Sequence, residues 1–360
     1  MRLCVVGVGA LGRHHARILN QIPGVDLVAV ADPQAEQGQQ VAETCGCEWT
    51  PDYRTLLDRV DAASIVVPTS LHLRVGSDFL NHGVPVLIEK PLAGNVRDGK
   101  ALVDLALSKR LPLQVGHIER FNPAFQELQA RCGEPKYIRA ERMSPYPFRS
   151  TDIGVVHDLM IHDLELIVNL VGEQPCRVEA FGVSVVGGHE DCVQARLHFP
   201  GGCIADVTAH RVCPTARRSL QVWSDQGCVT ADLQSRQVVG FTPGIPVRAG
   251  QLPFNLSQQP GADIPTLKAD MFGHFIAMEE VAGSSADALT AELSSFLDAV
   301  REHETPKVDG RQALRALEVA EQVLTSVKAH QWDGSPTGRT GPMALLDMHL
   351  PKTVSHRRAA

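Results

Sequence analysis

Two histidines and two aspartates lie within seven residues of this chain, in the stretch HDLMIHD at residues 157–163. Such groups could bind a metal ion, transfer protons, or form the polar part of an ordinary helix. At about 100° per helical residue, Asp158 and His162 lie on one face, whereas His157 and His162 diverge by about 140°. The spacing favours Asp158 and His162 as one working pair, with His157 and Asp163 as bystanders or supporting groups.

Other histidines and cysteines do not form a recognised metal site. His14 and His15 are adjacent and diverge on a helix, and the run HEDC at residues 189–192 matches no usual zinc spacing. Nine cysteines are scattered without a Cys-x-x-Cys pair, which indicates reduced thiols in a cytoplasmic protein. We therefore expect no metal.

A second group of chemistry-bearing residues directly follows the apolar run at residues 3–6. Gly7, Gly9 and Gly12 form a G-x-G-x-x-G motif, with Ala10 and Leu11 leading into a predicted helix. Glycines allow a tight turn and let backbone amides approach a pyrophosphate at the helix N-terminus. A dinucleotide-binding loop is therefore predicted here.

Asp32 ends the next apolar run, 20 residues beyond Gly12. A carboxylate at this position accepts hydrogen bonds from the adenosine ribose, and it repels a 2′-phosphate. The following Pro33 and Gln34 supply no arginine for such a phosphate. The cofactor expected from the sequence is NAD, with NADP the less favoured alternative.

Helices and strands must position these residues, and the sequence pattern that predicts them differs between two parts of the chain. Up to about residue 120, short apolar runs alternate with helical patterns, which predicts a doubly wound parallel sheet, a Rossmann domain. Residues 121–330 combine helical stretches with strand-like runs and tight turns, which predicts an α+β domain with a mostly antiparallel sheet. Within it, 242–266 is rich in Pro, Gly and Gln and is expected to be a loop or insertion, and 331–360 a tail.

The composition of the chain limits the kinds of partner that the protein is expected to bind. The formal charge of −7 and the lack of a long basic run disfavour nucleic acid, and no apolar window is long enough to span a membrane. A small-molecule substrate is the remaining expectation.

Two further polar groups stand where predicted parallel strands end, which is where ligands of such folds bind. Pro68 and Thr69 precede His72 after one strand, and Glu89 and Lys90 follow another.

Together with the glycine motif, the run Glu89-Lys90-Pro91, and Asp158 with His162, this pattern resembles the Gfo/Idh/MocA family of oxidoreductases. The resemblance runs to about residue 330. It implies that members oxidise or reduce a sugar or cyclitol carbon with NAD or NADP. It also implies cofactor contacts around Pro68, Thr69, His72 and Glu89, and a second-domain sheet that covers the active site and often builds a homo-dimer or homo-tetramer.

The resemblance also assigns catalytic roles. Lys90 would hydrogen-bond the reacting hydroxyl, Asp158 would orient the substrate, and His162 would accept the hydroxyl proton. Histidine suits this task because its ordinary pKa lies close to working pH, and a cationic Lys90 would stabilise developing alkoxide character. Considered singly, Lys90 is equally a surface lysine and His162 a core histidine.

A narrower likeness lies in GHIERFNP at residues 116–123, DLMIHD at 158–163 and HED at 189–191. These runs resemble the branch of UDP-N-acetylglucosamine 3-dehydrogenases, whose keto product is passed to a partner aminotransferase. Arg120 would then face the cofactor and Asn122 the sugar, although Asn122 before Pro123 also reads as a plain helix start. The family pattern usually has leucine or a small residue where His157 stands.

Three alternatives stay open at this point. One is a dehydrogenase of inositol or another free sugar or polyol. Another is a dinucleotide-sensing regulator without catalysis, which should have lost Lys90 or His162. The third is a metal enzyme, which the spacings above disfavour.

Overall fold

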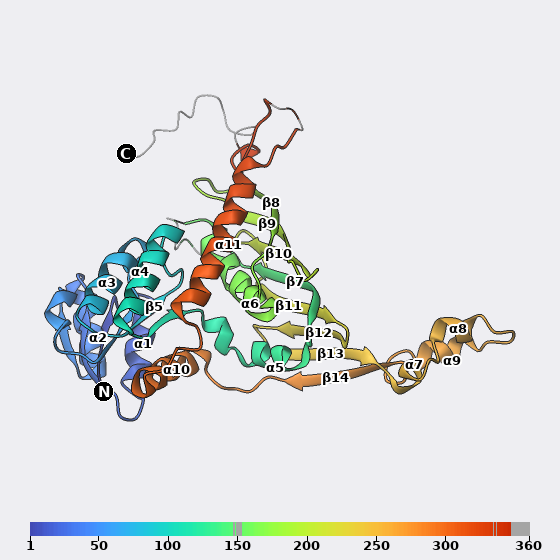
Figure 1. Ribbon diagram of the computed structural model, residues 1–360, viewed down its shortest axis with the longest axis horizontal. Helices are drawn as coiled ribbons and strands as arrows, with labels where there is room; N and C mark the ends of the chain where they lie inside the picture. The colour runs from blue at the N-terminus through green and yellow to red at the C-terminus, as the bar shows by residue number, and fades with distance from the viewer. Residues whose placement is uncertain (147, 149–152, 334, 336, 347–360) are drawn as a thin grey trace. The chain divides into compact units, whose positions relative to one another are not determined.

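The computed structural model describes residues 1–146, 148, 153–333, 335 and 337–346 (Figure 1). The chain forms two compact units. Unit 1 comprises Met1–Phe121 and Ala286–Glu321, and unit 2 comprises Asn122–Ser285 and the chain from Gln322 onward.

Unit 1 is built on a six-stranded sheet in which every pairing is parallel. Its order is β3-β2-β1-β4-β5-β6, so the order reverses between β1 and β4. This is the Rossmann arrangement, and the predicted fold class is confirmed. The strands are β1 Arg2–Val6, β2 Asp26–Ala31, β3 Glu48–Thr50, β4 Ala62–Ile65, β5 Val86–Glu89 and β6 Leu113–Gly116.

Helices cover both faces of this sheet, because alternate residues of its strands are apolar in both directions. Cys4 and Val6 of β1 belong to one apolar cluster, with α3 and α4, while Leu3 and Val5 belong to the other, with α1 and α10. The helices are α1 Gly12–Leu19, α2 Ala35–Cys45, α3 His72–Asn81, α4 Val96–Lys109 and α10 Ala288–Glu302, with short 3-10 turns Tyr53–Leu56 (η1), Thr69–Leu71 (η2) and Ile118–Phe121 (η3).

Helix α10 shows where linear division of the sequence differs from the fold. Its position after 121 placed it in the second domain, yet Leu289, Leu293 and Phe296 are buried in the cluster on the parallel sheet. Their spacing of three and four residues puts them on one helical face. Residues 286–321 therefore belong to unit 1, although they follow most of unit 2 in the sequence.

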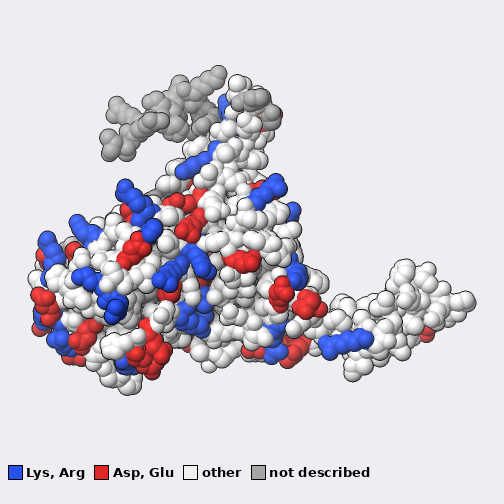
Figure 2. Space-filling view, in the orientation of Figure 1, with Lys and Arg blue, Asp and Glu red and all other residues white. Residues whose placement is uncertain are grey.

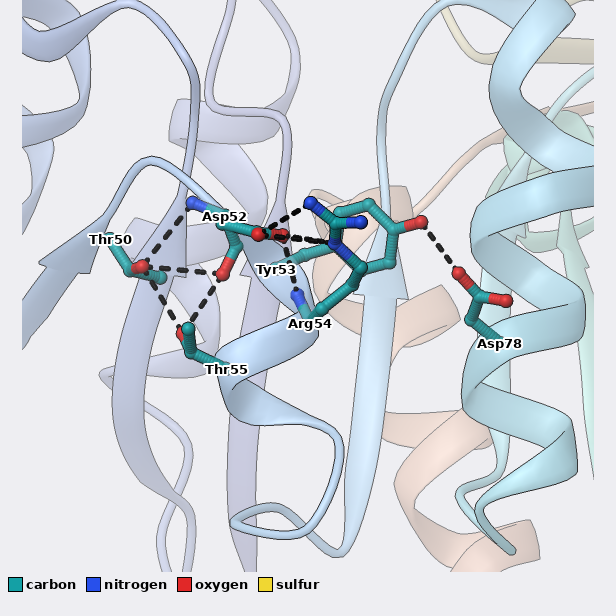
Figure 3. A network of polar contacts seen from close by, with 6 residues as sticks. All are labelled: Thr50, Asp52, Tyr53, Arg54, Thr55 and Asp78. Carbon is teal, nitrogen blue, oxygen red and sulfur yellow. Dashed lines mark hydrogen bonds and ion pairs between the residues drawn. The ribbon is translucent and has the colours of Figure 1, made fainter.

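A polar network ties the segment after β3 to α3 (Figure 3). The Asp52 carboxylate accepts from the backbone N–H of Arg54 at 3.0 Å and caps η1. The Tyr53 hydroxyl then donates to Asp78 on α3 at 2.7 Å. These contacts fix the helix that begins at His72, beside one of the predicted ligand-binding strand ends.

Unit 2 is built on an eight-stranded sheet of order β14-β13-β12-β11-β7-β10-β9-β8. Only the pairing of β7 with β10 is parallel, so the expected mostly antiparallel sheet is confirmed. The strands are β7 Pro135–Met143, β8 Arg177–Val183, β9 Cys192–His198, β10 Ile204–His210, β11 Arg217–Ser224, β12 Gly227–Asp232, β13 Gln237–Pro243 and β14 Ile276–Ala282.

Helices of unit 2 pack on this sheet. Helix α5 (Pro123–Arg131) contacts β12 and β13, and α6 (Ile161–Val171) contacts β7 and β10. A π-helical turn, η4 (Val156–Met160), leads into α6, so the stretch 157–163 is helical, as the argument from spacing assumed, but its first part is a π-helix and not an α-helix. The long α11 (Gly310–Ala329) begins in unit 1 and ends in unit 2.

The segment between β13 and β14 forms an arm that extends from the sheet (Figure 1). The arm, residues 244–275, contains most of the segment 242–266 that was expected to be a loop or insertion, and it holds three short helices. These are α7 Ile245–Arg248, α8 Pro253–Ser257 and α9 Ile264–Ala269, each with proline in its first turn, where a missing N–H costs nothing. Among the described residues, no helix is both long and apolar enough to cross a membrane.

Candidate active site

The glycine loop at the end of β1 is shaped by close backbone contacts. Gly7 has φ of +85°, and a Cβ there would lie 2.5 Å from the carbonyl oxygen of Val66. A Cβ at Gly12 would overlap the carbonyl oxygen of Gly7. Both positions therefore require glycine for the packing of the chain itself.

Gly9 differs from its neighbours. The nearest atom to a Cβ built there is Gln37 Nε2, at 4.0 Å. The chain thus needs no glycine at this point for its own packing. Ala10 and Leu11, the latter 42% exposed, then lead into α1. Open space beside a helix N-terminus fits a pyrophosphate, which backbone amides and the helix dipole stabilise.

Asp32 holds the loop from the neighbouring strand. Its carboxylate accepts from the backbone N–H groups of Val8 and Gln34, both at 2.9 Å, and from the Gln37 side chain at 3.1 Å. It is only 6% exposed. The predicted ribose acceptor therefore also couples the glycine loop to the end of β2.

Residues at the end of β4 divide into two kinds. Pro68 is exposed and Thr69 is half-buried at the start of η2. His72 is buried, and its ring nitrogens lie 2.9 Å from the carbonyl oxygens of Pro91 and Val67. His72 therefore connects the segment after β4 with the segment after β5. Its contact with the cofactor stays a prediction.

Lys90 directly follows β5 and is half-buried. His117 follows β6 and is buried. Burial first, and then the positive charges of Lys90 and Arg120, lower the pKa of His117 to about 3. His117 is neutral at ordinary pH as a result. It was quoted in a motif but given no role from sequence.

A second cation, Lys307, lies near Arg120. Burial, followed by the charge of Arg120, lowers the pKa of Lys307, whose Nζ lies 5.1 Å from the Phe121 ring centroid. Arg120 is 5% exposed and donates to Gln312 at 3.4 Å. Sequence spacing did not indicate Lys307, because it lies 187 positions from Arg120 along the chain. Together they suit an anionic group such as a phosphate.

Asn122 has the capping role that its sequence context allows. Its side-chain oxygen accepts from the N–H of Ala124 at 3.0 Å, and its side-chain nitrogen donates to the Leu233 carbonyl at 2.9 Å. The helix-start interpretation is confirmed. The contact with sugar stays a prediction.

In unit 2, the π-turn carries His157 and Asp158, and α6 carries His162. Asp158 and His162 are half-buried and four residues apart, about one turn of a π-helix, so they share a face. Short π segments within helices often occur at functional sites. Asp163 differs: it is buried and pairs with both Nε (3.0 Å) and Nη2 (2.8 Å) of Arg142 on β7.

The run at 189–191 supports the start of this turn. The Glu190 side chain accepts from the N–H of Val156 at 3.2 Å. Asp191 pairs with buried Arg211 at 2.8 Å, and Arg211 donates to the carbonyl of Ile153 at 2.7 Å. Within the described ranges, no group of three or more His, Cys, Asp or Glu side chains is arranged to hold a metal ion.

A parallel nucleotide-binding unit followed by a mostly antiparallel α/β unit defines a class of two-domain oxidoreductases. The description "Oxidoreductase family, NAD-binding Rossmann fold" matches residues 1–117, and the "GFO/IDH/MocA C-terminal domain" matches 128–230. The chain belongs to the Gfo/Idh/MocA family and is an NAD-dependent oxidoreductase.

Individual relatives sharpen the comparison. The chain is 36% identical to UDP-N-acetylglucosamine 3-dehydrogenase of Acidithiobacillus ferrooxidans over 91% of this chain and 98% of that protein. A solved structure of that enzyme superposes with a TM-score of 0.80 at 35% identity, covering 91% and 97% of the two chains. The NAD-dependent scyllo-inositol 2-dehydrogenase of Bacillus subtilis is 31% identical over 59% of this chain and 68% of its own.

The glycine loop makes a prediction that separates cofactor binding from folding. Gly9→Ala should weaken NADH binding by about tenfold, roughly 1.4 kcal/mol, because its methyl group enters the expected pyrophosphate space. Its unfolding free energy should change by less than about 0.5 kcal/mol. Gly12→Ala should instead lower the melting temperature, because its methyl group overlaps the chain. Fluorescence titration with NADH and thermal unfolding measure the two effects.

Gly94→Ala is the matched control, because nothing lies within 4 Å of a Cβ at Gly94. Unchanged NADH affinity in Gly9→Ala would show that the pyrophosphate lies elsewhere.

Proposed function

We propose that the protein transfers a hydride from a sugar hydroxyl carbon to NAD, and that this carbon is C3 of UDP-N-acetylglucosamine, giving the 3-keto sugar. The observation that carries the proposal is similarity to a UDP-N-acetylglucosamine 3-dehydrogenase over 98% of that enzyme's length. A keto product of this kind is a substrate for amination, so we include a downstream aminotransferase in the proposal. A cytoplasmic location stays a prediction.

The proposed chemistry uses the three residues to which the family resemblance assigns catalytic roles. His162 accepts the proton of the reacting hydroxyl, and Lys90 donates a hydrogen bond to the same oxygen and stabilises its developing negative charge. Asp158 accepts a hydrogen bond from the sugar and orients it. NAD, when bound, accepts the hydride from the oxidised carbon. Glu89 and His72 support the backbone on either side of Lys90.

Charge near Arg120 supports a substrate or cofactor that carries phosphate. The charge of Arg120 lowers the pKa of Lys307, so the two cations lie near each other, and both would attract an anionic group placed beside them. NAD and a nucleotide sugar both carry phosphate, and inositol does not. We favour a nucleotide sugar, with Asn122 near it, over a free polyol because the similarity to a UDP-N-acetylglucosamine 3-dehydrogenase extends over 98% of that enzyme's length.

The inositol alternative has a specific observation in its favour, the 31% identity to scyllo-inositol 2-dehydrogenase. That match leaves about a third of the relative's length uncovered. A regulator without catalysis is disfavoured because Lys90, Asp158 and His162 are all retained.

A substrate panel tests the proposal. NADH formation should be detectable with UDP-N-acetylglucosamine and about 100-fold lower in kcat/KM with UDP-glucose, because buried polar groups discriminate strongly against a missing partner. Free N-acetylglucosamine and myo- and scyllo-inositol should give no detectable turnover. Turnover of an inositol without turnover of the nucleotide sugar would replace the proposal with the alternative.

The catalytic roles predict the behaviour of two variants. Lys90→Ala and His162→Ala should each lower kcat by at least about 100-fold, the usual worth of an acid–base group, while NADH affinity changes little. Lys100→Ala and His82→Ala are the controls, since both residues are exposed in unit 1. Turnover near the wild-type value in Lys90→Ala or His162→Ala would remove that residue from the mechanism.

We further propose that the chain forms a homo-oligomer, a dimer or tetramer, in which the arm contacts a second copy. Several large apolar residues of the arm are exposed, among them Ile245 (83%), Phe254 (72%) and Phe272 (61%). Its charged residues are two basic and two acidic, so it is neutral although the chain as a whole carries −7. Figure 2 shows this largely uncharged surface. Two copies therefore meet without repulsion at the arm, as expected for the apolar centre of an interface.

The arm predicts the assembly state. The triple variant Ile245→Ser, Phe254→Ser, Phe272→Ser should have a lower mass than the wild type in light scattering at the same micromolar concentration, while NADH affinity is retained. Leu107→Ser, which changes an exposed residue on α4, is the control. A monomeric wild type, or a triple variant of unchanged mass, would contradict the arm's role.

A further inference from the structure

One face of the parallel sheet in unit 1 carries polar residues within an apolar cluster. Ser64 of β4 pairs with Leu87 of β5, which pairs with Gln114 of β6, and Glu89 pairs with Gly116. Since side chains alternate along a strand, all five positions belong to one face. Leu87 is buried there against residues of α1 and α10. The polar residues therefore lie beneath these two helices.

His15 of α1 and Glu89 are the centre of this group. His15 Nδ1 lies 2.9 Å from the Ser64 hydroxyl, and His15 Nε2 lies 3.2 Å from Glu89 Oε1, within ion-pair distance although not aligned as a hydrogen bond. Glu89 Oε2 accepts from the backbone N–H of Lys90 at 3.1 Å. A Cβ at Gly116 would lie 2.7 Å from Glu89 Oε1, so glycine is what leaves room for this carboxylate. Glu89 thus links His15 to the backbone of Lys90.

Glu292 of α10 completes the group and has no role in the mechanism above. Its side chain is fully buried, and its backbone carbonyl accepts from Gln114 Nε2 at 2.9 Å. Neither of its carboxyl oxygens has a hydrogen-bond partner among the described residues. Burial first, then the negative charge of Glu89, raise the pKa of Glu292 well above its ordinary value. Burial and the neighbouring carboxylate thus both favour the protonated form of Glu292, which has one hydroxyl proton to donate.

A buried polar atom without a hydrogen-bond partner destabilises the fold, so a buried carboxyl group of this kind calls for a functional explanation. Titratable and charged groups reach this region from β5 (Glu89), from α1 (His15) and from η3 (Glu119 and Arg120), and both α1 and η3 contact α10, while β6 contributes the uncharged Gln114. Of these, Glu89 is the charged group that acts on Glu292.

We propose that His15, Glu89 and Glu292 form a buried acid–base set that positions Lys90. The protonated Glu292 carboxyl donates a hydrogen bond to the Glu89 carboxylate through one buried water, and His15 Nε2 lies 3.2 Å from Oε1 of the same carboxylate. The orientation of the carboxylate then fixes the Lys90 amide and, with it, the start of the lysine side chain. The proposal rests on the proposed function for the catalytic role of Lys90.

The test compares Glu292→Gln, which keeps a neutral donor, with Glu292→Leu, which removes it. Glu292→Leu should lower kcat by about 10- to 100-fold, the range expected when a catalytic group is misplaced by about 1 Å. KM and NADH affinity should stay within about twofold, because Lys90 stabilises the transition state and a shift of its side chain leaves cofactor binding unaffected. Glu292→Gln should recover most of the loss. Glu302→Leu, an exposed change at the end of the same helix, is the control.

The pH profile gives a readout that a purely structural role would not move. In the wild type, ionisation of Glu292 as pH rises past its raised pKa places two carboxylates together, so kcat should fall there. Glu292→Gln cannot ionise, and this fall should shift upward or disappear. Thermal unfolding should agree: because the folded pKa is raised, wild-type stability is lost progressively as pH rises above about 4.5, the ordinary value, and Glu292→Gln should become relatively more stable over the same range.

Two results would overturn the proposal: an identical pH profile in Glu292→Gln, or Glu292→Leu with wild-type kcat. If Glu292→Leu does not fold, the pH profile of Glu292→Gln and the kcat of His15→Gln decide in its place, and unchanged values in both overturn it. Failure of the proposed function is distinct, because it appears as wild-type turnover in Lys90→Ala.

Discussion

The nucleotide-binding end depends on one close backbone contact, where the turn after β1 passes against Val66 at the end of β4. Gly7 and Gly12 allow this contact because neither has a side chain to separate the segments. Helix α1 then leaves toward one face of the sheet and α3 toward the other. Where neighbouring connections diverge in this way, a crevice opens at the carboxyl ends of the strands. The position of the cofactor, and of Lys90 two strands away, follows from that divergence.

Unit 2 depends instead on buried charges. The pairs Arg142–Asp163 and Arg211–Asp191 are almost fully buried. Buried ion pairs add little net stability against apolar replacements, but breaking one leaves an uncompensated charge. Asp191 also accepts from two backbone N–H groups, those of Val185 and Val186, at 2.7 Å. These pairs hold the chain on either side of the π-turn, so Asp158 and His162 are presented by a fixed backbone.

The two units illustrate different limits of sequence reasoning. The glycine motif and Asp32 were found from spacing, because the turn and the strand that form them are local. Strand β7 is hard to recognise from sequence although it lies in the middle of its sheet, because its residues Arg139, Glu141 and Arg142 mask the alternation of buried positions. Lys307 and Glu292 were missed for another reason. Each acquires its perturbed pKa from a residue far away in sequence, Arg120 and Glu89 respectively.

Spacing along HDLMIHD predicted Asp158 and His162 as a pair, since four residues bring side chains to one face in either kind of helix. The same stretch did not reveal its π-turn, whose start contacts Glu190, just before β9, while Ile153, shortly before the turn, contacts Arg211, just after β10. By itself, the sequence determined the family, the Rossmann fold class and the pair of catalytic candidates, because these depend on local periodicity and short motifs. Only the tertiary structure decided that α10 belongs to the first unit and that Glu292 lies beside Glu89, because burial and electrostatic coupling depend on packing between segments that the sequence separates.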